Sequence, residues 1–324
     1  MADSAPLDLL DRRILYQLDL DCRQSIPALA KKVGAKKDTV RFRLARLLKE
    51  KVITRFITEV NTAKFGYIGF KVYFQMQDFG REQEKEFFDY LLSFPQTGWV
   101  VRCSGRWDVL LVYWGRSSFE FHRDFEKIFS RFSRHIIHKE VAQNVAWFWY
   151  NRKWLVGEEA HAVGFEHGGP PEKFDLDLLD KRILSLLIED GRKPVVDIAR
   201  TAGTGPQNVL NRIRRLKKAG VISRFSIDID YKRLGLVFCK AFIYLQNISP
   251  KRLEELYAYC RRQPHVFALV LLLGPWDLEL EFEAHDFEEM MRIMDDLRQK
   301  FGDIIRNYES VMVSRQTTVR HIGE

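Results

Sequence analysis

The 324-residue sequence has few cysteines, and none of them stands in a metal-binding or disulfide pattern. No Cys-x-x-Cys pair occurs among the four, which are Cys22, Cys103, Cys239 and Cys260. This spacing argues against a zinc site and predicts reduced, structural thiols. No run approaches the roughly 18 apolar residues of a membrane span, and residues 1–6 are too short and polar for a secretory signal. We therefore expect a cytoplasmic protein without contact to a membrane.

The sequence also lacks the motifs of common enzymes. It contains no glycine-rich phosphate loop, no activated-nucleophile motif and no His/Cys metal cluster. We therefore expect neither a metal nor a cofactor. What the chain does have is a basic excess, with 52 Lys and Arg against 44 Asp and Glu. A net charge of +8 is compatible with a polyanionic partner, but it is not diagnostic until the charges are located.

The chain is a tandem duplication. Residues 8–15 (DLLDRRIL) recur as residues 177–184 (DLLDKRIL), an offset of 169 residues (177 − 8). The same offset aligns residues 52–56 (VITRF) with residues 221–225 (VISRF). Such self-similarity at a fixed spacing is the signature of repeated structural units. Between the copies, residues 157–173 are rich in Gly, Pro, Glu and His, which predicts an exposed linker.

Each copy begins with a pattern typical of a winged helix-turn-helix domain. In copy one, apolar periodicity predicts helices over 7–21, 26–33 and 36–51, with Gly34 breaking the second helix and a wing strand over 52–59. In copy two, the corresponding segments are 176–190, 195–202, 205–219 and 221–228.

Each copy continues with a βαββαβ pattern. In copy one the strands are predicted at 67–76, 98–105, 108–114 and 136–147, and the helices at 81–94 and 118–132. This order is typical of a ferredoxin-like sheet with helices on one face. Residues 109–112 are apolar without alternation, which indicates burial on both faces. We therefore expect each sheet to pair face to face with another, most simply the one in the other copy.

These patterns predict an α+β fold with two copies of the same two-domain unit. The predicted segments are a helix-turn-helix domain (1–62), a ferredoxin-like sensing domain (63–156), a linker (157–173), a second helix-turn-helix domain (174–231) and a second sensing domain (232–324).

Positive charge gathers on the third helix of each copy. Residues 36–51 hold seven Lys or Arg, and residues 204–219 hold five with no acid. An arbitrary basic helix is usually just a solvated surface, but this helix enters the DNA major groove in such domains. We therefore predict DNA contacts for its outward positions. They are Lys37, Asp38, Thr39, Arg41, Phe42, Arg46 and Lys49 in copy one, and Gln207, Asn208, Asn211, Arg214, Arg215 and Lys218 in copy two.

The second of these helices is the better equipped to read bases. Gln and Asn pair bidentately with adenine, and Arg pairs with guanine. Arg43 and Arg212 lie at the edge of the core face instead. Two roles stay open for them: an ion pair inside the domain, with Asp11 and Asp180 as partners, or a phosphate contact.

The combination of these motifs resembles the Lrp/AsnC (leucine-responsive regulatory protein) family. The resemblance rests on residues 9–15 (LLDRRIL), on Val40-x-x-Arg43-x-x-x-Leu47, and on a Gly-x-x-Asp hairpin in each sheet. It implies a regulator that binds double-stranded DNA, with sensing domains that pair within the chain, allow higher oligomers, and often bind an amino acid. By motif match, the effector hairpins hold Gly105 and Asp108 in copy one and Gly274 and Asp277 in copy two. The alternative role for both Asp side chains is to cap the turn. The aromatic run 147–150 (WFWY) departs from the family pattern, and we interpret it as core or interface packing.

Two other functions compete with this interpretation. The domain organisation also resembles that of siroheme decarboxylases, so the fold alone does not exclude an enzyme. The catalytic candidates would be His135 and His138, although copy two has no matching histidines. An architectural protein would coat DNA without reading it, but Gln207, Asn208 and Asn211 add little to such binding. The sequence therefore favours a sequence-specific transcription regulator.

Overall fold

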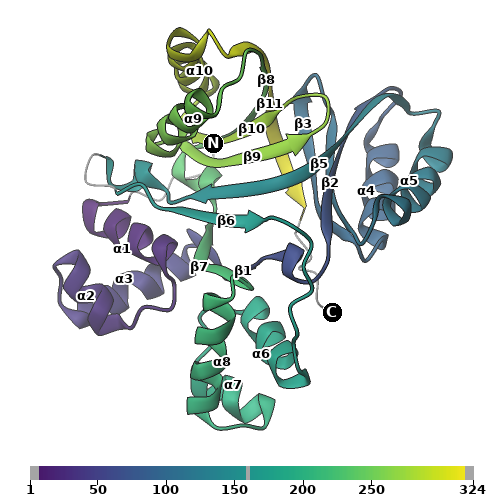
Figure 1. Ribbon diagram of the computed structural model, residues 1–324. Helices are drawn as coiled ribbons and strands as arrows, with labels where there is room; N and C mark the ends of the chain where they lie inside the picture. Colours follow the sequence, from purple (N-terminus) through teal and green to yellow (C-terminus); the bar gives the residue numbers. More distant parts are fainter. Residues whose placement is uncertain (1–6, 158–160, 318–324) are drawn as a thin grey trace.

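The computed structural model describes residues 7–157 and 161–317. Residues 1–6 of the first predicted domain, 158–160 of the predicted linker and 318–324 of the last predicted domain lie outside the described residues. Figure 1 shows two helix-turn-helix units below a curved array of strands that carries two helix pairs on its outside. Within the described ranges, no helix is both long and apolar enough to cross a membrane.

Both helix-turn-helix units have the expected three helices. They are α1 (Leu9–Leu20), α2 (Ile26–Val33) and α3 (Lys37–Lys49), then α6 (Leu178–Glu189), α7 (Val195–Ala202) and α8 (Pro206–Lys218). A capping box starts α1 at Asp8 and α6 at Asp177. Gly34 and Gly203 end α2 and α7 at a φ of 70°, a left-handed conformation that glycine adopts without strain.

The strands expected to be wings pair with each other. β1 (Ile53–Val60) and β7 (Ile222–Ile229) form a two-stranded antiparallel sheet across the duplication. The contacts around them are reciprocal: Cys22 N–H donates to the Phe225 carbonyl at 3.3 Å, and Gly191 N–H donates to the Phe56 carbonyl at 2.9 Å. A lone strand in each unit would leave both of its edges unpaired, whereas cross-pairing satisfies one edge of each strand.

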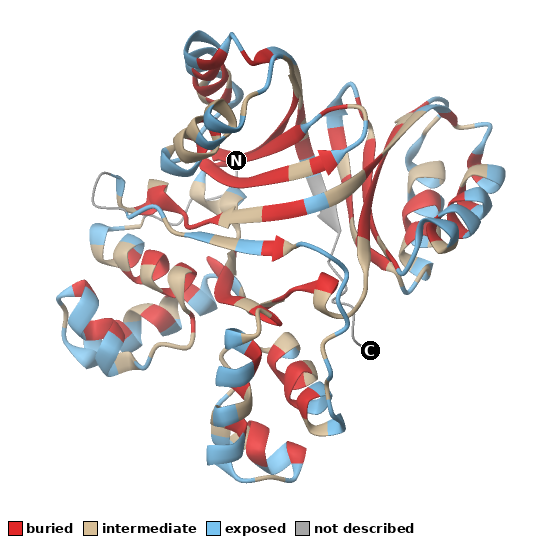
Figure 2. Cartoon of the chain, viewed as in Figure 1, coloured by how far each residue is buried: buried red, intermediate tan, exposed pale blue. Residues whose placement is uncertain are grey.

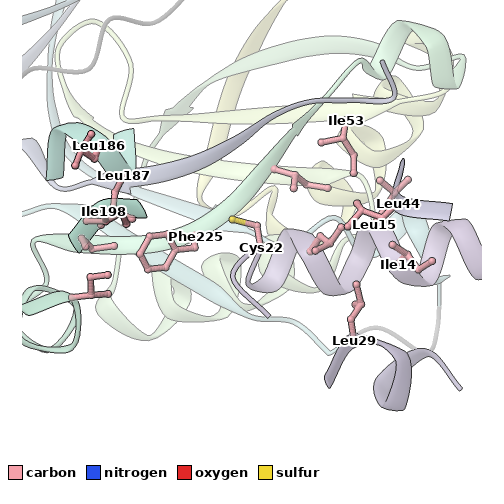
Figure 3. Close-up of a cluster of buried hydrophobic side chains, with 14 of the residues drawn as sticks. Ile14, Leu15, Cys22, Leu29, Leu44, Ile53, Leu186, Leu187, Ile198 and Phe225 are labelled. Carbon is pink, nitrogen blue, oxygen red and sulfur yellow. The ribbon is translucent and has the colours of Figure 1, made fainter. Parts of the chain in front are cut away.

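One hydrophobic core runs through both helix-turn-helix units. Figure 3 shows Leu15 and Leu44 of the first unit and Leu187 and Phe225 of the second in the same cluster, with Cys22 between them. Because the two units share buried side chains and a sheet, their recognition helices are held in a fixed relative position.

The two ferredoxin-like domains, predicted to be sensing domains, also combine. The first contains β2 (Ile68–Met76), α4 (Arg81–Ser93), β3 (Thr97–Gly105), β4 (Val109–Gly115), α5 (Ser118–Phe132) and β5 (Ile136–Tyr150). The second contains β8 (Val237–Leu245), α9 (Pro250–Arg262), β9 (Val266–Leu273), β10 (Leu278–Ala284), α10 (Phe287–Phe301) and β11 (Ile305–Thr317). The strand order is β2-β4-β3-β11-β8-β10-β9-β5, and β5 pairs back with β2, so the two sheets close into a single ring.

The closed ring explains why the strands are apolar on both faces. In β4, Val109 and Leu111 belong to the cluster beneath α4 and α5, while Leu110 and Val112 belong to the interior cluster. That interior cluster includes residues of both copies. The helix-free faces of the two sheets therefore meet, as expected. In addition, the edges of the two sheets are hydrogen-bonded to each other.

The segment predicted as an exposed linker is in part a strand. β6 (Gly164–Gly168) pairs with the second half of β5, on the edge that β2 leaves free. Short 3₁₀ turns at Thr62–Lys64, Lys153–Leu155 and Tyr231–Leu234 connect the strands near the junction with the helix-turn-helix units. Composition alone misses β6, because its backbone hydrogen bonds depend on the free edge of β5.

Candidate nucleic-acid interface and ligand cavity

The recognition helices α3 and α8 bury one face and expose the other. Val40, Leu44 and Leu47 are buried in α3, as are Val209, Ile213 and Leu216 in α8. Figure 2 shows exposed residues along the outer sides of these helices. Of the thirteen residues predicted to contact DNA, only Arg46 is not exposed.

The exposed face of α8 carries a connected row of polar side chains. The Gln207 amide donates to Asn211 Oδ1 at 3.0 Å, and Arg214 Nη1 donates to the same oxygen at 3.3 Å. Asn208 Nδ2 donates to Thr204 Oγ1 at 2.9 Å one turn away. Two amides and a guanidinium one turn apart match the donor and acceptor pattern of base edges in a major groove.

The exposed face of α3 is different in character. Phe42, at the position equivalent to Asn211, is 68% exposed although it is a large apolar side chain. Asp38 and Arg41 form an exposed ion pair at 2.7 Å. This helix therefore presents an apolar contact and a charge pair where α8 presents amides.

Four arginines on the inner edges of these helices bind buried aspartates. Arg43 Nη1 lies 3.1 Å from Asp11 and Arg212 Nη1 lies 2.8 Å from Asp180, so the intradomain ion pair is the role that the structure supports for both. Arg46 and Arg215 bind Asp11 and Asp180 as well. The fully buried Asp11 carboxylate draws Arg46 back to 30% exposure, which corrects its predicted outward orientation, whereas Arg215 stays 50% exposed beside Asp180.

The outer carboxylates of the α1 and α6 capping boxes join these ion pairs. Arg43 lies 2.6 Å from Asp8, and Arg212 lies 2.6 Å from Asp177. The hydrogen bond from the Arg212 guanidinium lowers the pKa of the Asp177 carboxyl. These pairs lock each recognition helix onto the first helix of its own unit.

The aspartates of the hairpins predicted to bind an effector accept hydrogen bonds from a neighbouring strand of the same copy. Asp108 Oδ2 accepts from the Met76 N–H, and Asp277 Oδ2 accepts from the Leu245 N–H, both at 2.7 Å. Each aspartate thus ties its hairpin to the end of an adjacent strand, β2 or β8, and the effector role of these hairpins stays a prediction. A Cβ at Gly105 would come within 3.0 Å of the Ser310 carbonyl, and one at Gly274 within 2.7 Å of the Ala142 side chain. Each glycine thus allows close contact with the last strand of the other copy.

The two histidines considered as catalytic candidates contact different residues. His138 is exposed, stacks on Trp107 with 5.7 Å between ring centroids, and lies 3.1 Å from Glu140. The His135 ring lies 3.4 Å from the Gln77 carbonyl. A different trio could hold a metal ion: His265, His285 and Glu289 have ligand atoms within 4.8 Å of one another. The spacing of this trio along the chain gives no metal motif, because neighbouring elements bring the side chains together.

A cavity of about 480 Å³ lies between the β1–β7 sheet and the ring of strands. Seven aromatic side chains line it, among them Trp99, Trp114, Trp147 and Trp149, together with three arginines and four carboxylates. Arg224 of β7 also lines it, and this side chain is only 2% exposed. The sequence analysis did not predict this cavity. Two features of the sequence point to residues of its wall: the aromatic run 147–150, and the repeated motif that ends in Arg55-Phe56 and Arg224-Phe225.

Comparison with known proteins supports the family assignment. A model of the AsnC-type helix-turn-helix domain matches residues 7–48 and 176–217. The chain is 31% identical over 143 residues to the HTH-type transcriptional regulator AldR of Mycolicibacterium smegmatis, covering 43% of this chain and 84% of that protein. It is 32% identical over 120 residues to the proline dehydrogenase transcriptional activator of Rhodobacter capsulatus, covering 37% of this chain and 78% of that protein.

Among solved structures, the siroheme decarboxylase NirDL has a similar fold over 98% of this chain and 94% of its own, with a TM-score of 0.64 and 13% identity. This likeness concerns the fold alone. The regulator relatives each match about the length of one copy, as a tandem duplication requires. The chain therefore belongs to the Lrp/AsnC family of helix-turn-helix transcription regulators, in a form that joins two copies in one polypeptide.

Proposed function

We propose that this regulator binds one specific, non-palindromic double-stranded DNA site through α3 and α8, and that a small molecule controls this binding. The observation that carries the proposal is the exposed row Gln207, Asn211 and Arg214 on α8. Polar side chains that are aligned, exposed and not engaged by the core are suited to read base edges. The inner arginines, in contrast, are occupied by Asp11 and Asp180.

Phosphate contacts and base contacts fall to different residues in this proposal. Lys49 and Lys218 occupy equivalent exposed positions in the last turns of α3 and α8. At these positions a positive charge can contact the phosphates of the DNA backbone. Phe42 offers an apolar contact of the kind that thymine methyl groups accept.

We predict that Asn211→Ala lowers affinity mainly for the preferred site, by roughly 1–3 kcal/mol, because a base contact is lost. Lys218→Ala should weaken binding to all DNA and reduce the salt dependence by about one counterion, because a phosphate contact carries no sequence information. Fluorescence anisotropy with the site selected from random DNA, and with a scrambled duplex, measures both. Both variants are exposed and should fold as the wild type. An equal loss on both duplexes for Asn211→Ala would remove this residue as a base reader.

We also predict that the two halves of the selected site differ in sequence. A homodimer presents two identical helices and therefore selects a palindrome, whereas here Phe42 stands opposite Asn211 and Asp38 opposite Gln207. Phe42→Ala and Asn211→Ala should then each alter selection in one half-site, and the half-sites should lie about 10 base pairs, or a multiple, apart. Selection from random DNA followed by footprinting measures this. Recovery of an inverted repeat that is equally sensitive to both substitutions would contradict it.

We further propose that the chain is not a decarboxylase, despite the fold that it shares with NirDL. The two candidate histidines do not line the cavity, and they contact Glu140, Gln77 and Trp107 instead. The absorption spectrum of the purified protein tests this, since a tetrapyrrole substrate carried through purification would give a Soret band. A protein that shows this band and converts the bound tetrapyrrole would refute the proposal.

A further inference from the structure

The duplication places two equivalent Arg–carboxylate pairs across the β1–β7 sheet, and the two pairs differ in distance and in burial. Arg55 lies opposite Asp228, and Arg224 lies opposite Glu59, in the same antiparallel register. Arg55 Nη2 binds Asp228 at 2.7 Å, with both side chains 38% exposed. Arg224 is only 2% exposed, yet its nearest carboxylate oxygen, on Glu59, is 3.9 Å away. One pair is thus closed at the surface, while the other is open and buried.

Arg224 is a buried cation with unused hydrogen-bond donors. Its Nε and Nη1 find no hydrogen-bond acceptor among the described residues, and its guanidinium lies over the rings of Trp149 and Phe165 at 5.3 and 5.6 Å. A buried charge without hydrogen bonds is costly, so it persists in a fold only where something else satisfies it. Because Arg224 lines the cavity of about 480 Å³, its guanidinium can pair with an anionic group of a ligand in that cavity.

The other charged groups of the cavity wall already have partners. Arg152 binds Glu283 at 2.9 Å, and Glu281 lies 2.8 Å from Lys240. Arg55 and Asp228 form a further pair. Within the part of the chain that the structure describes, Arg224 and the half-buried Glu59 are then the charged groups of the wall without a close partner.

The aromatic walls define the shape of the ligand. Trp147 and Trp149 are parallel to within 8°, with centroids 5.5 Å apart, and Trp114 lies 6.4 Å from Trp147. Gly98 keeps Trp114 flat against the sheet, because a Cβ there would overlap its indole ring. Flat aromatic surfaces favour a planar ring as occupant, and the volume suits a small molecule.

We propose that this cavity binds a planar aromatic carboxylate of one or two rings, aromatic amino acids included. The Arg224 guanidinium pairs with the carboxylate, and the ring packs against the tryptophans. The cavity wall includes β1 and β7, which begin a few residues after α3 and α8 end. The ligand thereby contacts the strands that hold the two recognition helices. Control of DNA binding by this ligand rests on the proposed function, whereas binding of the ligand does not.

The test is calorimetric titration of the full chain without DNA. Indole-3-propionate carries the ring and the carboxylate, tryptamine carries the ring and a cation, and 3-methylindole carries the ring alone. We expect indole-3-propionate to bind and the other two to bind at least about 10-fold more weakly, since a charged hydrogen bond contributes that much. Equal binding of tryptamine, or no heat with any aromatic carboxylate, would overturn the proposal.

Two matched variants separate the proposed contact from a structural role. Arg224→Met keeps the apolar stem and should raise the Kd of indole-3-propionate at least about 10-fold. Its melting temperature without ligand should stay equal or rise, since an unsatisfied buried charge is removed. Arg233→Met, which removes a 40% exposed arginine paired with Asp230 outside the cavity wall, should change the Kd by less than about 3-fold. Unchanged affinity in Arg224→Met, or tight binding of a porphyrin carboxylate in place of the indole acid, would refute the assignment. Failure of DNA binding would leave these results unaffected.

Discussion

Glu279→Gln is expected to lower the free energy of unfolding by about 3–5 kcal/mol, because it removes one partner of a buried ion network. Inside the ring, Glu279 Oε2 lies 2.5 Å from Lys71 Nζ and 3.2 Å from Lys240 Nζ, and all three side chains are at most 1% exposed. The duplication makes Lys71 and Lys240 equivalent, but only copy two supplies the acids. Glutamine keeps the shape and leaves two buried ammonium groups to Glu281 alone.

Urea unfolding followed by circular dichroism measures this loss. Glu172→Gln is the matched control, because it breaks an ion pair with Lys64 in which the carboxylate is 66% exposed, and a surface pair contributes only about 0–1 kcal/mol. Similar losses for the two variants would show that the interior network contributes no more than a surface pair.

The same network makes stability depend on acid. Burial alone would raise the pKa of Glu279, but Lys240 and Lys71 outweigh it and lower the pKa to about 2 from its usual 4.5. The unfolded chain then binds one proton more than the folded chain between these values, so stability falls as the pH drops from 4.5 toward 2, by about 3 kcal/mol for this group. Glu279→Gln should remove this part of the acid slope. A variant with the wild-type slope would contradict the assignment.

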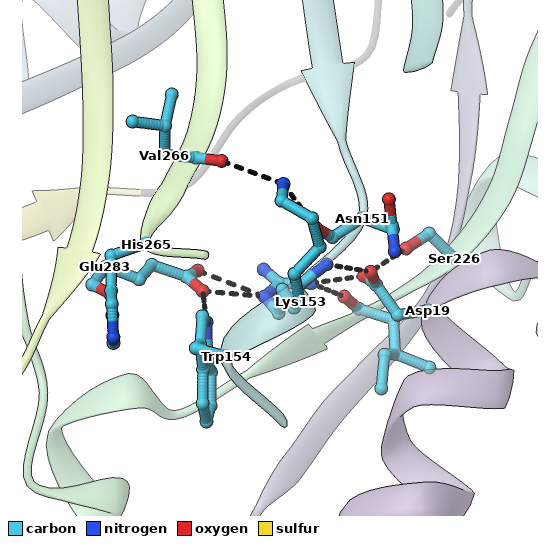
Figure 4. Close-up of polar contacts among 10 residues, drawn as sticks. Asp19, Asn151, Lys153, Trp154, Ser226, His265, Val266 and Glu283 are labelled. Atoms are coloured by element: carbon cyan, nitrogen blue, oxygen red, sulfur yellow. Dashed lines mark hydrogen bonds and ion pairs between the residues drawn. The ribbon is translucent and has the colours of Figure 1, made fainter. Parts of the chain in front are cut away.

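Arg152→Met is the second substitution with a large expected effect, a loss of about 3–5 kcal/mol. Arg152 donates to Asp19 Oδ1 at 2.6 Å, to both Glu283 oxygens at 3.1 and 2.9 Å, and to the Ile227 carbonyl at 3.1 Å. Figure 4 shows Asp19 and Glu283 on opposite sides of this network, which also includes Trp154. Methionine would leave two buried carboxylates without their cation.

Because of the position of Arg152, we expect this variant also to change the number of unfolding transitions. Asp19 belongs to α1, Ile227 to β7 and Glu283 to β10, so one side chain joins both helix-turn-helix units to the second sensing sheet. We expect Arg152→Met to separate the unfolding of these parts into two transitions in calorimetry. Arg152→Lys keeps the charge but loses the planar fork, and it should lose less stability. A single transition with wild-type stability in Arg152→Met would contradict both expectations.

The sequence by itself determined the repeated local elements. The helices of both DNA-binding units were predictable because apolar periodicity, acidic caps at Asp8 and Asp177, and the Gly34 and Gly203 turns are local signals. The order of strands and helices in the sensing domains followed from the same kind of pattern. The outward faces of α3 and α8 were predictable for most positions, since helical geometry assigns them from one buried residue.

Only the tertiary structure decided which partner each surface meets. The alternation of β10 (LELEFEA) indicates that its glutamates share a face, and an isolated sheet would expose that face, yet Glu279, Glu281 and Glu283 point into the ring and are buried. The cross-pairing of β1 with β7, the return of Arg46 to Asp11, and the difference between Arg55 and Arg224 likewise depend on residues that are distant in the chain or on burial. Periodicity specifies which side chains share a face, whereas the environment of that face depends on contacts between the copies.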